Sequence, residues 1–309
     1  MSELPRLTII TPSLNQAQSL ERTIRSVLDQ NYPNLEYLVI DGGSTDGSKE
    51  IIEKYADRLH WWCSQNDRGP AHALNKGLDK ATGDLITTLN SNDWYLPGVL
   101  HKVGEFFRDK PKTDFLYGQC QLCNAQGEYI QTHRGNIFTL EELLDLWNVW
   151  RTERRFLQPE CFWSRRVFLK VRSFREDLTQ AYDYEYWTRL FLAGARVERL
   201  EADICGVSFD ENKQTADEEW TTREELEIIE PILWNPQARL SPTLRRKLQA
   251  DWLFDAQLQP TISESASQSD PHWKQYLKVG QVILRHPIVL YSDRLWQHFN
   301  SSRQNDVQG

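Results

Sequence analysis

The chain has 309 residues and a formal net charge of −8 at pH 7. This length fits one domain of ordinary size and an appendage. The acidic balance and the lack of a basic stripe argue against nucleic acid as the main partner. No apolar run reaches the ~20 residues that a membrane-spanning helix needs, and no signal peptide precedes the first expected strand, so we expect a cytoplasmic protein. The five cysteines fit a reducing compartment.

The first hundred residues alternate predicted strands with predicted helices. Strands are expected at residues 7–11, 37–40, 59–63 and 85–89, because each is a short apolar run that ends in polar or turn residues. Apolar residues at spacings of three and four predict helices between the strands, and Pro70 suits the first turn of the third helix. This alternation predicts an α/β fold with a largely parallel sheet and right-handed crossovers.

Three successive strand ends carry acidic polar loops. Asp41 opens an Asp-Gly-Gly-Ser-Thr-Asp-Gly sequence, Asp67 follows the third strand, and Asp93 ends an Asn-Ser-Asn-Asp sequence. In an alternating sheet these ends share one edge, where ligands bind. Asp93 offers a carboxylate suited to Mg²⁺ or Mn²⁺, and Asn90 and Asn92 add neutral oxygens. A single run of this kind is also an ordinary turn, so the repetition is what favours a binding site.

The first half of the chain resembles the family 2 glycosyltransferases, which have the nucleotide-sugar-binding fold called GT-A. The resemblance covers residues 5–215, and the matching segments are 11–15, 26–30, 41–47, 67–69, 75–77, 81–84 and 89–93. No single segment is specific, but their order and spacing together are. The resemblance implies an inverting transferase that moves a sugar from a nucleoside diphosphate sugar, with UDP-sugars favoured, to an acceptor hydroxyl. It also implies a place in the synthesis of a bacterial surface polysaccharide or glycan.

The resemblance further implies roles for individual residues. It assigns the contacts with the donor's base, ribose and diphosphate to the polar loops, namely Thr11, Pro12, Ser13, Asn15, Asp41, Asp67, Gly69, His72, Asn75, Asn90 and Asn92. Asp93 stands at the acidic metal-binding motif, usually Asp-x-Asp, which implies a divalent metal cofactor, Mg²⁺ or Mn²⁺. Asn92 replaces an acid there and reduces the charge available to an ion. Downstream, Asp210 aligns with a position where relatives often carry a histidine near the metal.

The acceptor side is expected in residues 111–215, and the nucleotide-sugar half in residues 1–110. Apolar residues at i, i+4 and i+7 from Tyr186 predict a buried helix. Asp183 lies in its first turn, where the helix dipole favours the ionised carboxylate. Aspartate is also a preferred helix cap, so the residues alone leave both roles open. The family match selects Asp183 as the general base, and one base without a protein nucleophile implies inversion.

Two features that suggest a functional site also have a simpler structural explanation. His72 lies where many relatives place Asp and is able to reach a donor diphosphate, but a lone helical histidine is more often structural. Cys120 and Cys123 have the spacing of a metal or redox pair. No second pair follows them, and residues three apart on a strand face opposite sides, so we expect an ordinary strand there.

Beyond residue 215 the pattern changes to a helical extension, residues 216–309, with a disordered tail. Pro231 and Pro242 are among the prolines expected to break its helices. The segment 272–299 is amphipathic and rich in Trp, Lys and Arg. It fits two arrangements: peripheral contact with the inner face of a membrane beside a lipid-linked acceptor, or packing on the catalytic domain or on a second subunit of a homodimer.

Two other classes of protein fit parts of the pattern. A catalytically weak nucleotide-sugar-binding subunit of a glycan assembly complex would explain Asn92 and His72 as signs of lost catalysis, but the retention of Asp93 and Asp183 argues against it. A dinucleotide-dependent oxidoreductase needs a Gly-x-Gly-x-x-Gly turn after the first strand. Residues 11–16 contain no glycine, so that class is excluded.

Overall fold

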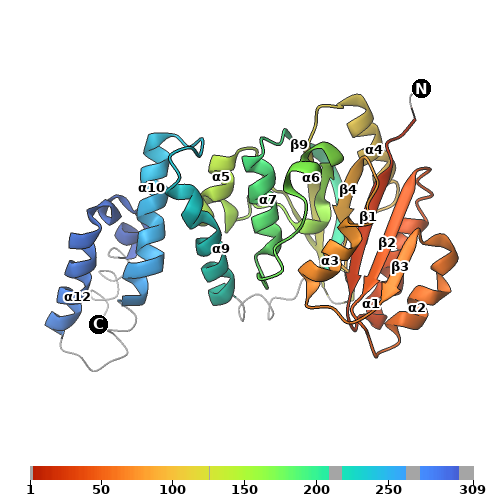
Figure 1. The fold of residues 1–309 in the computed structure, drawn as a ribbon, viewed down its shortest axis with the longest axis horizontal. Coiled ribbons are helices and arrows are strands. Elements are labelled where there is room, and N and C mark those ends of the chain that lie inside the picture. The colour runs from red at the N-terminus through yellow and green to blue at the C-terminus, as the bar shows by residue number, and fades with distance from the viewer. Residues whose placement is uncertain (1–2, 125, 209–217, 262–271, 299–309) are drawn as a thin grey trace. The chain divides into compact units, whose positions relative to one another are not determined.

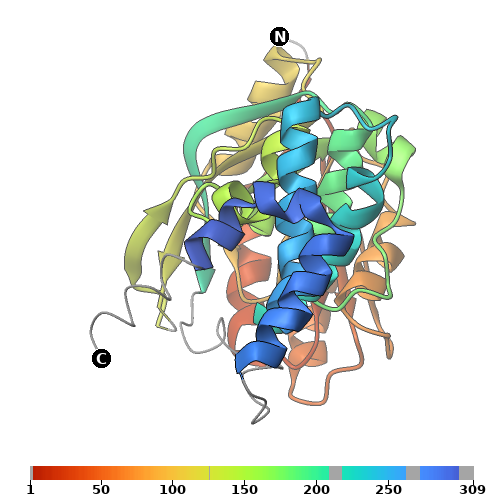
Figure 2. The same cartoon turned by 90° about the vertical axis from the view of Figure 1, so that its left-hand side faces the viewer.

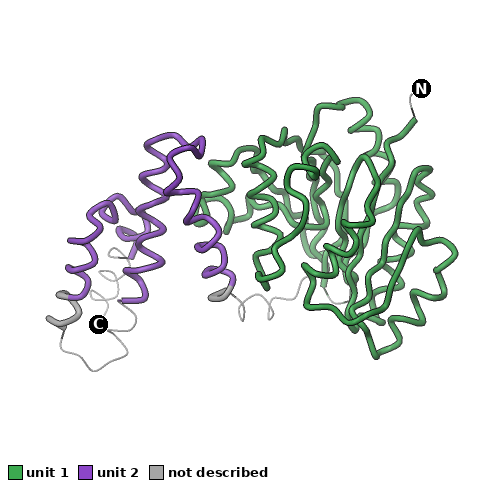
Figure 3. Tube along the Cα trace, in the orientation of Figure 1, with its two compact units in different colours: residues 1–218 green, residues 219–309 purple. Residues whose placement is uncertain are grey.

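The computed structural model describes residues 3–124, 126–208, 218–261 and 272–298. Its internal contacts divide the chain into two compact units, residues 1–218 and residues 219–309 (Figure 3). Within the described residues, the first unit contains every strand (Figure 1), whereas the second is helical, with its helices coloured teal to blue in Figure 2.

The sheet of the first unit has nine strands within the described residues. They are β1 (Leu7–Ser13), β2 (Leu35–Asp41), β3 (Trp61–Ser64), β4 (Leu85–Thr88), β5 (Trp94–Tyr95), β6 (Phe115–Cys123), β7 (Tyr129–His133), β8 (Cys161–Ser164) and β9 (Val197–Ser208). Their order is β3-β2-β1-β4-β8-β6-β9-β5, and β7 pairs with β6. The first four strands of this order run parallel, as the alternating pattern predicted. Beyond β4 the sheet is mixed, because β8 pairs antiparallel with both β4 and β6.

Helices cover both faces of this sheet (Figure 1). They are α1 (Ala17–Leu28), α2 (Ser48–Lys54), α3 (Pro70–Leu78), α4 (Val99–Asp109), α5 (Leu140–Leu144), α6 (Arg165–Val171) and α7 (Tyr182–Leu192), with short turns η1 (Ala56–Arg58), η2 (Leu146–Trp150) and η3 (Gln158–Glu160). Leu7 and Ile9 of β1 pack with α1, α2 and α4. Ile10 points to the other face and meets α3. The predicted α/β fold is therefore confirmed, and the structure adds that helices flank the sheet on both faces.

Helix α3 packs directly on the sheet because Gly77 has no side chain. A Cβ at Gly77 would lie 2.5 Å from Cγ2 of Ile10 and 3.1 Å from Cδ1 of Ile40. Pro70 opens the helix, as predicted, where its missing N–H costs no hydrogen bond. The close contact brings the first turn of α3 to the edge where β1 and β2 end.

An aromatic cluster fixes α7 on the same face of the sheet as α3. The ring of Trp187 lies 5.2 Å from the rings of both Phe115 and Trp163. Tyr186 is fully buried, and Leu190 is buried beside it, which confirms the predicted buried face of this helix. Because buried rings of this size stabilise their contacts strongly, the start of α7 has a defined place on the domain.

The second unit contains α9 (Glu218–Leu233), α10 (Pro242–Leu253), η4 (Phe254–Leu258), α12 (His272–Arg285) and η5 (Pro287–Tyr291). Pro242 begins a helix, as expected of a proline at a break. The predicted break at Pro231 is wrong, since α9 continues through it for two more residues. A proline so close to a helix end removes one hydrogen bond and leaves the last turn in place.

No helix within the described residues is both long and apolar enough to cross a bilayer. The tail expected to be disordered, residues 301–309, lies outside the described part of the chain.

Candidate functional site

Asp41 shapes the loop that follows β2. It ends that strand in register with Ser13 at the end of β1, and it is fully buried. Its carboxylate accepts the backbone N–H groups of Gly43 and Ser44 at 3.2 and 3.0 Å and the Ser64 hydroxyl at 2.7 Å, and the Ser44 hydroxyl donates to it as well. Four donors occupy the two oxygens, so Asp41 holds the loop after β2 in shape.

The loop after β1 is also tied down by its own side chains. Asn15 has a left-handed backbone (φ 52°), and its Oδ1 accepts the N–H of Thr45 at 3.0 Å. The Thr11 hydroxyl lies 3.1 Å from the Tyr37 hydroxyl inside the core. Ser13 differs from both, because its buried hydroxyl has no hydrogen-bond partner within the described residues. An unpaired buried hydroxyl at a strand end is available to bond a ligand or a water molecule.

Asp67 connects the loops after β2 and β3. A Cβ at Gly42 would lie 2.6 Å from Oδ2 of Asp67, so only glycine permits this contact. The other oxygen, Oδ1, accepts the N–H of Gly69 at 2.9 Å. Gly69 immediately precedes α3 and has a φ of 123°, which favours glycine. The carboxylate of Asp67 therefore sets where α3 begins relative to the loop after β2.

Asp93 is a buried acid with little compensation for its charge. It is 3% exposed, and two long hydrogen bonds reach it: Nδ2 of Asn90 donates to Oδ2 at 3.3 Å, and the N–H of Ser208 donates to Oδ1 at 3.4 Å. Burial raises the pKa of the Asp93 carboxyl to about 7. The ionised form therefore benefits from a nearby cation.

A group of three residues that the sequence did not single out braces the turn containing Asp93. The guanidinium of Arg22 lies 3.7 Å from the centre of the Trp94 ring and donates to the backbone oxygen of Asn92 at 3.2 Å. The same ring lies against Gly206 of β9, where there is no room for a Cβ. An arginine on a helix surface carries no local sequence signal, so only the three-dimensional contact identifies Arg22.

Asp183 lies half-buried in the first turn of α7, with the N–H of Tyr184 donating to its Oδ1 at 2.7 Å. Its neighbour Tyr182 shows where this turn faces. Burial raises the pKa of the Tyr182 phenol, and the carboxylates of Asp183 and Asp93 raise it further. Both acids therefore lie within electrostatic range of one phenol, although they come from opposite halves of the unit.

Glu185, the other acid of this turn, has a different partner. Its two oxygens accept from Arg189 at 2.6 and 2.7 Å, and Arg189 also donates to the backbone oxygens of Val171 and Ser173. Glu185 thus ties α7 to the end of α6. The carboxylate of Glu185 is therefore engaged by Arg189.

The side chains of Asn75 and His72 are engaged by the protein itself. Asn75 accepts the N–H of Phe174 at 2.8 Å and donates to the backbone oxygen of Phe174 and to Glu176, both at 3.0 Å. Nδ1 of His72 accepts the N–H of Arg68 at 3.1 Å. We expected the amide of Asn75 at the donor, whereas the structure joins it to the segment before α7.

The parallel register places the ends of β1, β2 and β4 at one edge of the sheet (Figure 1). The predicted site residues at or beside this edge are Pro12, Ser13, Asn15, Asp41, Asp67, Gly69, His72, Asn75, Asn90, Asn92 and Asp93, and α7 adds Asp183. Thr11 lies beneath them in the core. Asp210 lies outside the described residues, two positions beyond Ser208.

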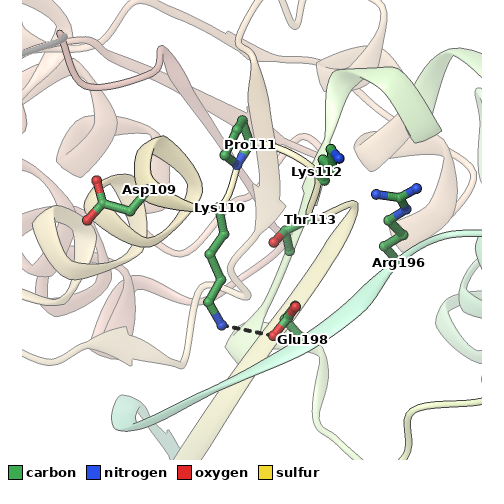
Figure 4. A pocket seen from close by; sticks show the side chains of 7 residues that line it. All are labelled: Asp109, Lys110, Pro111, Lys112, Thr113, Arg196 and Glu198. Atoms are coloured by element: carbon green, nitrogen blue, oxygen red, sulfur yellow. Dashed lines mark hydrogen bonds and ion pairs between the residues drawn. The ribbon is translucent and has the colours of Figure 1, made fainter.

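A cavity of about 410 Å³ lies at the opposite edge of the sheet (Figure 4). Its lining residues come from the segments just before β6 and from the start of β9: Asp109, Lys110, Pro111, Lys112, Thr113, Arg196 and Glu198. Lys110 pairs with Glu198 at 3.0 Å across it. None of the predicted site residues reaches this cavity, so we assign no part of the chemistry to it.

The turn at residues 90–93 fits a divalent ion in chemistry but offers little charge. No group of three or more His, Cys, Asp or Glu side chains within the described residues could hold a metal ion. Asp93 is the turn's single carboxylate, and because its burial disfavours the charged form, a cation beside it would stabilise the ionised carboxylate. The amide oxygens of Asn90 and Asn92 are hard ligands of the kind that Mg²⁺ and Mn²⁺ take. These residues suit an ion held jointly with a substrate's phosphates.

Acidic loops at parallel strand ends, facing a helix that carries another acid, place this protein in the GT-A class of glycosyltransferase folds. TarS 1-349 from S. aureus, in complex with UDP-GlcNAc, has a TM-score of 0.62 and 19% identity over 90% of this chain and 80% of that chain. The mannosyltransferase PcManGT from Pyrobaculum calidifontis, in complex with GDP-Man and Mn²⁺, has a TM-score of 0.56 and 19% identity over 94% of this chain and 84% of that one.

The chain belongs to glycosyl transferase family 2, whose model matches residues 8–172. The resemblance in the sequence is thereby confirmed. The putative teichuronic acid biosynthesis glycosyltransferase TuaG of Bacillus subtilis is 36% identical over 109 residues, which are 34% of this chain and 43% of TuaG. The chain spans about a third to a half of the length of the curated relatives it matches. Asp183 lies beyond the end of the family match, so its role as general base stays a prediction.

Proposed function

We propose that this protein is an inverting glycosyltransferase that moves a sugar from a nucleoside diphosphate sugar, with UDP-sugars favoured, to a hydroxyl of a glycan or lipid-linked acceptor. The observation that carries the proposal is the set of polar loops at the shared edge of β1, β2 and β4, which includes the buried Asp93. The family match supports the reaction class. The name of TuaG supports a role in bacterial surface polysaccharide synthesis, and the nucleotide sugars bound to TarS and PcManGT support the donor class.

The proposed chemistry needs one base. Asp183 accepts the proton of the acceptor hydroxyl, because a neutral alcohol is a poor nucleophile. The acceptor oxygen forms a bond to the anomeric carbon while the bond from that carbon to the diphosphate oxygen breaks, and the nucleoside diphosphate leaves with the electron pair. One displacement without a covalent intermediate inverts the configuration at that carbon. Departure of a diphosphate does not require a second carboxylic acid, in contrast to glycoside hydrolysis.

Asp93, with the amide oxygens of Asn90 and Asn92, would hold the divalent ion. When bound, such an ion supplies positive charge that stabilises the diphosphate. The protein's own contribution is to fix the carboxylate, through the hydrogen bonds from Asn90 and Ser208 and through the contact of Arg22 with the backbone of Asn92. With one formal charge in the turn, the ion's affinity depends strongly on the nucleotide.

Titration calorimetry with UDP, GDP and dTDP, each with Mn²⁺ and with EDTA, tests the proposal. We expect one nucleotide to bind and its affinity to fall in EDTA. The variant Asp93→Asn is the matched control, and it should lose the Mn²⁺-dependent part of the affinity. Absence of binding to all three nucleotides would contradict an intact transferase. Binding without turnover of any nucleotide sugar would favour the nucleotide-sugar-binding subunit instead.

A further inference from the structure

We infer that Asn75 is a positioning residue for Asp183 and not a ligand of the donor. Asn75 and Arg68 on the donor side, together with Phe174 and Glu176 on the acceptor side, form a set of contacts that we call the interhalf clamp. The clamp joins α3 to the segment just before α7, whose first turn carries the proposed base. This inference rests on the proposed function, because it takes Asp183 as the base.

The amide of Asn75 holds Phe174 by both of its backbone groups. Oδ1 of Asn75 accepts the N–H of Phe174 at 2.8 Å, and Nδ2 donates to the carbonyl oxygen of Phe174 at 3.0 Å. The second proton of Nδ2 has a partner too, since Nδ2 also donates to Oε1 of Glu176 at 3.0 Å. Two hydrogen bonds to one residue fix both its position and its orientation. They also leave one lone pair of the amide for anything else.

Glu176 connects the clamp to the loop that carries Asp67. While Asn75 holds Oε1, the guanidinium of Arg68 pairs with Oε2, so both oxygens are held from the donor side. Hydrogen bonds from Asn75 and Arg68 lower the pKa of Glu176 and keep it ionised. The side chain of Arg68 is 69% exposed, and ion pairs of this kind contribute little by themselves. The contacts of Asn75 are therefore the principal ones.

Phe174 connects the clamp to α7 through ring contacts. Its side chain is 2% exposed, and its ring stacks on Tyr186 at 4.1 Å and meets Tyr182 edge-on at 6.0 Å. Tyr182 and Tyr186 lie on either side of Asp183 in the sequence of the first helical turn. A displacement of Phe174 therefore moves the turn that carries the base. A shift of about 1 Å in a reacting group can lower a rate about 100-fold.

The clamp and a donor contact predict opposite effects of the variant Asn75→Asp. The new carboxylate keeps the acceptor for the N–H of Phe174, loses both donors, and adds a like charge beside Glu176. If the clamp positions Asp183, we expect hydrolysis of UDP-GlcNAc by water to slow by about 10- to 100-fold. We expect the dissociation constant of UDP with Mn²⁺ to change by less than about 3-fold, since no donor contact is lost.

Hydrogen exchange supplies a readout that needs neither donor nor acceptor. With Asn75→Asp we expect faster exchange of the backbone amides of residues 182–186, because the first turn of α7 loses its support. The matched control is Asp177→Asn in the same segment. Asp177 pairs with Arg175 at 3.1 and 2.5 Å, and within the described residues it has no hydrogen bond or ion pair with α3. This control should leave the exchange of residues 182–186, the hydrolysis rate and UDP binding unchanged.

Two results would overturn the inference. A loss of UDP affinity of more than about 10-fold with unchanged exchange would make Asn75 a donor ligand. Unchanged exchange and unchanged turnover would show that the clamp positions nothing.

If Asn75→Asp does not fold, the variant Glu176→Gln tests the inference in its place. It keeps the shape of the side chain and loses its charge, and we expect several-fold slower hydrolysis. Failure of the proposed function can be told apart from failure of this inference. In the first case the wild-type protein would bind no nucleotide, whereas the hydrogen-exchange comparison would still show whether the clamp supports α7.

Discussion

Asp93 and Asp183 are both acids of the candidate site, yet the protein surrounds them differently. Asp93 is buried with two long hydrogen bonds, an environment in which a carboxylate needs a cation. Asp183 is half-buried at the start of a helix and accepts a backbone N–H at 2.7 Å. There the helix dipole favours the ionised form, which is the form a general base requires. The two environments suit two different tasks.

Replacement of Asp183 tests its task directly. Asp183→Asn should lower the rate of sugar transfer by about 10²- to 10⁴-fold, because the amide cannot accept the proton of the acceptor hydroxyl. UDP binding, measured by calorimetry, should stay the same. Glu185→Gln is the control from the same turn, and it should keep transfer within a few-fold while lowering the melting temperature through its lost pair with Arg189. Near wild-type turnover of Asp183→Asn would remove Asp183 from the mechanism.

At position 92, a substitution is expected to increase metal affinity. Asn92→Asp adds a second carboxylate to the turn that carries Asp93 and should tighten Mn²⁺ binding about 10-fold, since affinity rises with the number of charged ligands. The measurement is UDP affinity at a series of Mn²⁺ concentrations. Asn92→Ala serves as the control and should give no gain. An unchanged Mn²⁺ dependence in Asn92→Asp would place residue 92 away from the ion.

At the scale of elements, the same substitution at two helical glycines is expected to have opposite effects on stability. Gly77→Ala forces a Cβ to within 2.5 Å of Ile10 and should destabilise the protein by about 1–2 kcal/mol, because the overpacking outweighs the gain in helix propensity. Gly280 of α12 has nothing within 4 Å of an added Cβ, so Gly280→Ala should stabilise by up to about 1 kcal/mol. Denaturant unfolding measures both. Stabilisation by both changes would mean that α3 does not lie tightly on β1.

The contact between α10 and the end of η5 predicts a pH-dependent stability. Asp251 is fully buried; Ser292 donates to its Oδ1 at 2.7 Å, and Oδ2 has no partner within the described residues. Burial raises the pKa of the Asp251 carboxyl to about 6. The unfolded chain releases this proton at lower pH, so the free energy of unfolding falls as pH rises between about 4 and 6. Well above pH 6 the carboxylate is ionised in both states, and the folded protein carries the full free-energy cost of burying its charge.

Asp251→Asn removes this charge and should raise the free energy of unfolding at pH 7.5 by up to about 2 kcal/mol. The gain should shrink toward pH 4, where the folded carboxyl is protonated and the unfolded one is about half protonated. Thermal unfolding at pH 4, 5, 6 and 7.5 measures the difference. A gain that does not vary with pH would show that the ionisation of Asp251 is not its source.

The strands that sequence patterns predicted are those whose signal is local. β1, β2 and β4 are short apolar runs that end in polar loops, and each was expected within two or three residues of its observed bounds. β5 has two residues and exists only because it pairs with β9, more than a hundred positions away. The insertion of β8 between β4 and β6 is equally non-local. Strand pairing between such distant segments cannot be predicted from the pattern of neighbouring residues.

The candidate site shows the same limit. The acids of the strand ends were predictable, because strand alternation places them at one edge. The direction of the amide of Asn75 was not, since it depends on where Phe174 lies, 99 positions away. Arg22 was missed for the same reason, because its partner Asn92 lies 70 positions away.

At the scale of the whole molecule, the chain's two compact units each have a buried core. We expect calorimetric unfolding to show two transitions. Gly77→Ala should lower the transition of residues 1–218, and Asp251→Asn at pH 7.5 should raise that of residues 219–309. If one substitution moved both transitions equally, the units would unfold as a single cooperative body.

The loop after β2 has a consequence for how such proteins diversify. Asp41 meets the hydrogen-bonding needs of that loop, and Asn15 joins it to the loop after β1, so its conformation does not depend on an occupant. Substitutions of the side chains around this loop should therefore leave its backbone conformation unchanged. For the same reason we expect the loop to keep its conformation if it is transferred, together with Asn15, to another protein of this fold.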